Sequence, residues 1–160
     1  MRRFSLVAFL TLIVATLAAF FITQHLKVTT PLITGVTGPI PAAINPVSGI
    51  TCSGPVSHQN GGHRSTEIAF YLLHQSDAVD VYVIDANGDR VATLASNRFM
   101  SRSKKVPVPF VWDGRAQDES VAPAGRYYFQ VHLIHQNRTV TISNQSGPLP
   151  VTLTTRAACP

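Results

Sequence analysis

Three carboxylates lie close together in a short polar stretch of this sequence, between its only tryptophan and a run of three aromatic residues. The stretch reads VWDGRAQDESVAPAGRYYF, residues 111–129, and the three acids are Asp113, Asp118 and Glu119. Carboxylates grouped beside aromatic rings can bind a metal ion, hold a sugar or transfer protons. Aspartate, glycine and proline also build turns between β-strands. The surrounding elements therefore decide whether this stretch is a site or a turn.

The acids by themselves do not predict a metal centre or a catalytic site. Calcium takes about six to eight oxygen ligands, and Ala116 has no carboxylate to add to the three acids. The sequence has no G-x-S-x-G motif, no H-E-x-x-H motif and no glycine-rich phosphate loop followed by a helix. His132 and His135 are three residues apart, which on a β-strand places them on opposite faces. We therefore expect a protein that is not an enzyme and that has no metal and no cofactor.

We interpret the stretch as a structural turn between two strands. The Trp112 ring is expected to be buried, and the Asp113 carboxylate is placed to accept hydrogen bonds from the backbone of the turn that Gly114 permits. Proline and glycine further on bend the chain back into the aromatic run. The residues assigned to this turn are Trp112, Asp113, Gly114, Pro123, Gly125 and Tyr127.

The sequence from residue 66 onward consists of short apolar runs separated by turn signals, which is typical of an all-β sandwich. In the second run Val79, Val81 and Val83 share one face, because side chains alternate along a strand. Seven runs of this kind are present: 66–74, 78–86, 90–95, 106–112, 126–135, 138–144 and 149–153.

Two signals between these runs predict local geometry. Asn87-Gly88 predicts a hairpin with a type I′ turn, because both residues tolerate the positive φ that this turn requires. Pro107 and Pro109 cannot donate hydrogen bonds to a neighbouring strand, so the run that contains them is expected at the edge of a sheet.

The N-terminus carries a long uncharged run at residues 4–22. A helix of this length spans about 28 Å, close to the ~30 Å of the hydrocarbon core of a membrane. This favours an uncleaved transmembrane anchor; the alternative is a cleaved signal peptide, whose apolar region is usually shorter, at about 7–15 residues. Arg2 and Arg3 precede the run, so we expect a single-pass protein of the cell membrane with its N-terminus cytoplasmic and its C-terminal domain extracytoplasmic.

The rest of the chain divides by composition. We expect an anchor at 1–26, a flexible Pro/Gly-rich linker at 27–65, the β-sandwich at 66–155 and a short tail at 156–160. Cys52 and Cys159 flank the sandwich and are candidates for a disulfide in an oxidising compartment; two unpaired thiols are the alternative.

The charge of the chain is modest once the anchor is set aside. The formal net charge is +5, and two of the cations, Arg2 and Arg3, belong to the N-terminal segment, so no nucleic-acid partner is expected. One segment, NRFMSRSKK at 97–105, concentrates cations without an acid and adds a phenylalanine and a methionine that we expect to be exposed. Its cations are Arg98, Arg102, Lys104 and Lys105. They predict either contact with an anionic partner or a solvated hairpin loop.

The order of these elements resembles the FlgD Ig-like domain, a β-sandwich found in flagellar hook-capping proteins and in many exported bacterial proteins. The resemblance is carried by IAFYLLHQSDAVDVYVIDANGDRVATL and FVWDGRAQDESVAPAGRYYFQV, and it extends from residue 66 to about 153. The matching positions are Phe70, Leu72, Val79, Val81, Val83, Gly88, Val91, Leu94, Trp112, Asp113, Gly114, Arg115, Pro123, Gly125 and Tyr127. Ala116 stands where the family usually has an acid and Glu119 where it usually has a glycine, and the family's Val-Pro is here Ala122-Pro123.

The resemblance implies an Ig-like sandwich that is a structural or interaction module and not a catalyst. We therefore expect a membrane-anchored, extracytoplasmic module of the bacterial cell envelope that contacts an envelope protein. The alternative is a domain that binds cell-wall glycan or another anionic polymer through the loop at 97–105. The sequence leaves the specific partner and the oligomeric state open.

Overall fold

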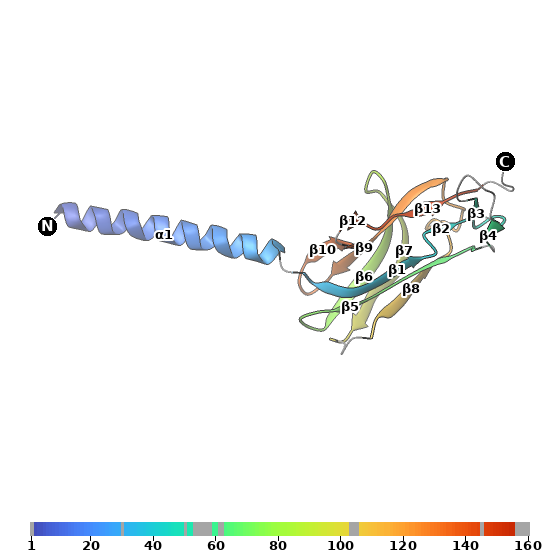
Figure 1. Cartoon of the computed structure of the whole chain (residues 1–160). Helices are drawn as coiled ribbons and strands as arrows, with labels where there is room; N and C mark the ends of the chain where they lie inside the picture. The colour runs from blue at the N-terminus through green and yellow to red at the C-terminus, as the bar shows by residue number, and fades with distance from the viewer. Residues whose placement is uncertain are drawn as a thin grey trace. The chain divides into compact units, whose positions relative to one another are not determined.

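The computed structural model describes the chain except for residues 1, 30, 50, 53–58, 61–62, 103–105, 145 and 156–160. It contains two compact units, residues 1–31 and residues 32–160. The first is a single helix, α1 (Arg2–Thr29), and the second is built from β-strands (Figure 1).

The polar side chains of α1 that the structure describes bond within the helix. The hydroxyls of Thr11, Thr16 and Thr23 donate to the carbonyls four residues earlier, at 2.7–2.9 Å. Over the described part of the chain, none of the helical segments combines the length and the apolar character needed to cross a membrane.

Each of the seven runs expected from the sequence contains a strand, so the all-β prediction is confirmed. These strands are β5 (Thr66–Leu72), β6 (Asp77–Asp85), β7 (Arg90–Met100), β8 (Val108–Trp112), β9 (Gly125–Leu133), β10 (Arg138–Thr141) and β13 (Val151–Leu153). Their alternation buries one face: Val79, Val81 and Val83 are each 0% exposed. Short strand pairs join them, namely β3 (Thr51–Cys52) with β4 (Gln59–Asn60) and β11 (Ser143–Asn144) with β12 (Gly147–Pro148).

The strands form two main sheets that enclose the core. The small sheet has the order β1-β5-β8, and the large sheet has the order β2-β13-β9-β6-β7 with β10 paired to β9. β8 lies at an edge, as Pro107 and Pro109 predict. The core contains side chains from both sheets, including Phe70 and Phe110 of the small sheet, whose rings stack at 5.2 Å, and Phe129 of the large one.

The prediction of a flexible linker at 27–65 is wrong for its central part. β1 (Ile33–Ile40) pairs with β5, β2 (Ala43–Ile44) pairs with β13, and Leu32 and Ile44 are buried in the core. β1 lies at a sheet edge and its register shifts twice, which is how the glycines and the proline of ITGVTGPI fit a strand.

The turn between β6 and β7 also differs from the prediction. The Asp85 carbonyl accepts the Gly88 N–H at 3.2 Å, Gly88 has a φ of +92°, and Asn87 does not have a positive φ. The loop is therefore a three-residue hairpin with one left-handed glycine, not a type I′ turn. The Asp85 carboxylate fixes it by accepting the N–H groups of Asn87 and Asp89 at 2.8 and 2.9 Å.

The connections of the sandwich lie at two ends. The chain enters at Leu32, whose carbonyl accepts the Leu73 N–H at 3.0 Å. This entry end also holds residues 73–76, 101–102, 106–107 and 134–137, whereas the far end holds 86–89 and 113–124. The predicted disulfide cannot be placed, because Cys159 lies outside the described residues.

Candidate functional site

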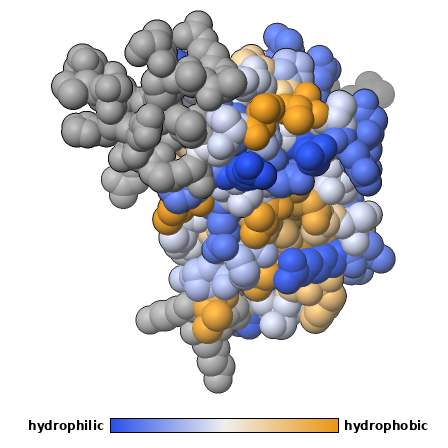
Figure 2. Space-filling model, turned by 90° about the vertical axis from the view of Figure 1, so that its right-hand side faces the viewer, coloured by the Kyte–Doolittle hydropathy of each residue, from blue (hydrophilic) through white to orange (hydrophobic). Residues whose placement is uncertain are grey.

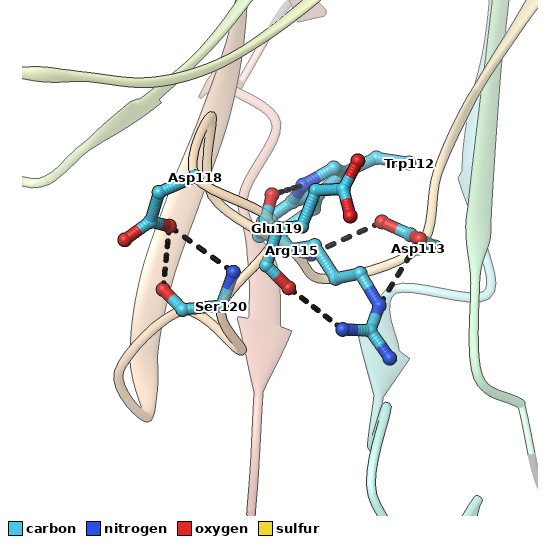
Figure 3. Close-up of polar contacts among 6 residues, drawn as sticks. All are labelled: Trp112, Asp113, Arg115, Asp118, Glu119 and Ser120. Atoms are coloured by element: carbon cyan, nitrogen blue, oxygen red, sulfur yellow. Dashed lines mark hydrogen bonds and ion pairs between the residues drawn. The ribbon is translucent and has the colours of Figure 1, made fainter.

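The stretch with the three carboxylates is the far-end loop 113–124, between β8 and β9. Trp112, the last residue of β8, is 1% exposed, and its ring lies 4.9 Å from that of Tyr127. Its indole N–H donates to the Arg115 carbonyl at 2.8 Å (Figure 3). The tryptophan therefore ties the loop to the core.

The carboxylates of Asp113 and Asp118 stabilise the loop's own backbone. Asp113 accepts the Arg115 N–H at 3.1 Å and pairs with the Arg115 guanidinium at 3.6 Å, while that guanidinium also donates to the Glu119 carbonyl at 2.7 Å (Figure 3). Asp118 accepts the N–H and the hydroxyl of Ser120 at 3.1 and 2.6 Å, and these bonds lower the pKa of Asp118. Among the described residues, no group of three or more His, Cys, Asp or Glu side chains could hold a metal ion.

Two residues of this loop have a left-handed backbone conformation. Gly114 has a φ of +79°, and a Cβ there would lie 2.8 Å from Pro46 and 3.1 Å from Leu153. Glu119 has a φ of +65°, a left-handed conformation that glycine adopts more easily. Gly125 has no such requirement, because its φ is not positive and it simply begins β9.

The loop also covers part of a sheet edge. β7 is the last strand of the large sheet, and Gln117 bonds to it twice: its N–H donates to the Val91 carbonyl at 2.9 Å and its side-chain oxygen accepts the Thr93 N–H at 3.1 Å. Beside this contact lies an open hollow of about 390 Å³. It is lined by residues 92–94 of β7 and by Trp112, Asp113, Arg115, Ala116, Gln117 and Glu119.

Tyr127 anchors the return of the chain into β9. Its hydroxyl donates to the Pro123 carbonyl four residues earlier at 2.6 Å, and burial raises its pKa. This resembles the tyrosine corner of Ig-like sandwiches, in which a tyrosine near the start of a strand bonds back to the upstream backbone. Tyr127 and Pro123 are therefore structural residues of the turn.

The basic segment 97–105 is only partly a loop. Arg98 lies within β7 with its guanidinium 4.8 Å from the centre of the Phe110 ring, and Met100 is 3% exposed, so the expectation of an exposed methionine is wrong. Phe99 is 69% exposed. The Arg102 N–H donates to the Ser76 hydroxyl at 2.7 Å, and Lys104 and Lys105 lie outside the described residues.

Sequence reasoning missed a buried carboxylate at the entry end. The Asp77 side chain is 0% exposed and accepts the backbone N–H of His135 at 2.9 Å, contacts its Nδ1 at 2.7 Å and accepts the Gln136 amide at 3.1 Å. Burial raises the pKa of Asp77, but these hydrogen bonds outweigh it and leave the pKa below its usual value. His132 has a separate partner, the Thr139 hydroxyl at 3.0 Å. No local sequence pattern predicts the burial of Asp77 or its hydrogen bonds, because its partners are 58 and 59 residues away in the sequence.

The two-sheet core, the buried tryptophan and the tyrosine corner define an Ig-like β-sandwich module. The family model of the FlgD Ig-like domain matches residues 55–137, more than half of the chain. The chain therefore belongs to the FlgD Ig-like domain family. A comparison with curated proteins finds no match.

Proposed function

We propose that this chain is a membrane-anchored, extracytoplasmic module of the bacterial cell envelope that serves as a structural or protein-interaction domain without catalytic activity. Membership of the FlgD Ig-like family carries this proposal. The candidate site supports it as well, since Asp113, Asp118 and Arg115 bond to their own loop.

The outer face of the small sheet supports an interaction role. Ile40, Glu67 and Val111 are cross-strand neighbours in β1, β5 and β8, and the two aliphatic side chains are 63% and 55% exposed. Exposed apolar side chains around one carboxylate offer a partner both contact area and a point of charge recognition. Figure 2, which shows the side of the molecule at the right of Figure 1, also has separate apolar patches set among polar residues.

The anchor is supported by the sequence of α1. Residues 4–22 carry no charge, and Arg2 and Arg3 precede them. Extraction of membranes with alkaline carbonate tests this part. Retention of the chain in the pellet, with the sandwich cleaved when protease is added to intact spheroplasts, is the expected result; release into the supernatant would contradict it.

The interaction role is tested by a photo-crosslinking amino acid at Val111 of the full chain in its membrane. We expect a discrete adduct of defined mass. The matched control carries the same group at Asp118, which is exposed on the far-end loop. Adducts at neither position, or equal smears at both, would argue against an interface on the small sheet.

The alternative, an anionic polymer bound through the segment 97–105, is supported among the described residues by Arg98 and Arg102.

A further inference from the structure

Acidic side chains are concentrated at the far end of the sandwich. Six of the eight Asp and Glu residues of the chain lie there, in the 86–89 and 113–124 loops and in the strand ends beside them. They are Glu67, Asp85, Asp89, Asp113, Asp118 and Glu119. The arginines near them are Arg64, Arg90, Arg115 and Arg126. Among the described residues, six carboxylates against four arginines make the far end net acidic.

The two other acids lie toward the entry end, and both are engaged. Asp77 is buried against His135 and Gln136. Asp80 accepts the Asn97 N–H at 2.7 Å and the Tyr82 hydroxyl at 2.8 Å. Both carboxylates keep their negative charge, because hydrogen bonds to the ionised form lower the pKa of each.

Arginines and histidines also lie at the entry end. Arg98 and Arg102 are exposed, Arg138 begins β10, and His74 and His135 are exposed in the entry-end turns. The Arg98 guanidinium is held over Phe110, and the bond from Arg102 to Ser76 fixes the backbone beside it. Among the described residues, the entry end therefore holds three arginines against two carboxylates and is net positive.

The connection between α1 and the first residue of the sandwich is short. Three peptide units join Thr29 to Leu32, which reach at most about 11 Å. In a helix that crosses a membrane with residues 4–22, the seven residues beyond add about 10 Å. Headgroups occupy roughly 5–8 Å of that distance on each side, and electrostatic attraction extends a further ~8–10 Å at physiological salt.

From this we infer that the entry end of the sandwich docks on an anionic lipid surface, with Arg98 and Arg102 facing the headgroups of the membrane that holds α1. The inference rests on the proposed membrane anchor. It assigns the far end, with its acidic loops, to the side that faces away from the lipid.

The test uses the full chain reconstituted in two kinds of vesicle, phosphatidylcholine alone and phosphatidylcholine with phosphatidylglycerol. A fluorescent amino acid replaces the exposed Ser101 at the entry end, and a fraction of the lipid carries a headgroup quencher. We expect at least twofold more quenching in the anionic vesicles, and the excess should fall as salt is raised. Equal quenching in both vesicles would overturn the docking.

Two variants and a matched control sharpen the result. Arg98→Gln/Arg102→Gln should remove at least half of the excess quenching, and Arg102→Gln alone, which leaves the contact with Phe110 intact, should remove part of it. Arg126→Gln removes an exposed arginine from the far end and should have no effect. An equal loss in all variants would overturn the assignment to the entry end.

Separate readouts distinguish the anchor from the docking. If carbonate strips the chain from the vesicles, the anchor and the docking both fail. If the chain stays in the vesicles after carbonate treatment but its quenching is the same with and without anionic lipid, only the docking fails. Equal quenching together with retention on a polyanion resin that Arg98→Gln/Arg102→Gln abolishes would instead assign these cations to an anionic polymer.

Discussion

At the scale of single residues, the side chains of loop 113–124 whose chemistry suggests a site are used to hold its backbone. Asp113 and Asp118 each accept an N–H two residues ahead, at 3.1 Å in both cases. This is the local bonding that makes aspartate a turn residue. Carboxylates of this type suggest a metal site or a catalytic site. Here each one has a backbone N–H two residues further along the chain, and accepting that N–H stabilises a turn.

Glu119 is a position where a change is expected to stabilise the protein. Its φ of +65° is costly for any residue with a Cβ, and the family usually has glycine there. Glu119→Gly should raise the free energy of unfolding by up to about 1 kcal/mol, because the relieved strain exceeds the entropy that glycine gains in the unfolded chain. Glu119→Ala keeps the strain and is the control in thermal melts. A Gly variant that melts below the Ala variant would contradict this explanation.

Asp77 should make the free energy of unfolding depend on pH in the acidic range. Its pKa is lower in the folded protein than in the unfolded chain, so the unfolded chain binds the proton first as pH falls. The stabilisation is present above about pH 4 and is lost as pH falls through the folded-state pKa. Denaturant unfolding at several pH values should show this loss for the wild type. Asp77→Asn should be less stable at pH 7 by about 2 kcal/mol and flatter below pH 4; parallel profiles would refute the role of Asp77.

At the scale of elements, regular alternation made the main strands predictable and irregular strands were missed. Val79, Val81 and Val83 predict β6, because a strand with one face in the core has an apolar side chain at every second residue. β1 does not repeat, because Gly35 and Gly38 both have positive φ and its register shifts twice. An edge strand needs hydrogen bonds on only one side, so it tolerates such breaks. Its pairing with β5 and the packing of Ile33 and Val36 against the core follow from the tertiary structure and not from any local pattern.

The contact of Gln117 with β7 gives a prediction for that edge. The side chain replaces a neighbouring strand at Thr93, so Gln117→Ala should expose the Thr93 N–H and speed its hydrogen exchange several-fold. Global stability should change by less than about 1 kcal/mol, because the residue is exposed. Gln117→Glu keeps an acceptor oxygen and is the matched control. Unchanged exchange at Thr93 in the Ala variant would show that Gln117 does not protect the edge.

At the scale of the whole molecule, the sandwich is larger than the segment that the family pattern covers. The family model matches residues 55–137. The core nevertheless includes Leu32 and Ile44 before it and Val151 and Leu153 after it. β1 and β2, which complete the two sheets before this match, are the strands with the weakest sequence signal, whereas β13 lies in the apolar run at 149–153.

This gives a test of where the folding unit begins. A chain that starts at residue 32 should unfold cooperatively, whereas a chain that starts at residue 66 loses β1 and β2 and exposes the core beneath them. The burial of Leu32 and Ile44 alone contributes about 3–6 kcal/mol, a large part of the ~5–15 kcal/mol that stabilises a typical domain. Denaturant unfolding followed by circular dichroism, with reductant present so that Cys52 cannot contribute a disulfide, should separate the two chains. Leu32→Ala in the longer chain should cost about 2–5 kcal/mol without abolishing the fold. If the shorter chain unfolds cooperatively with the same midpoint, residues 32–65 do not contribute to the stability of the sandwich.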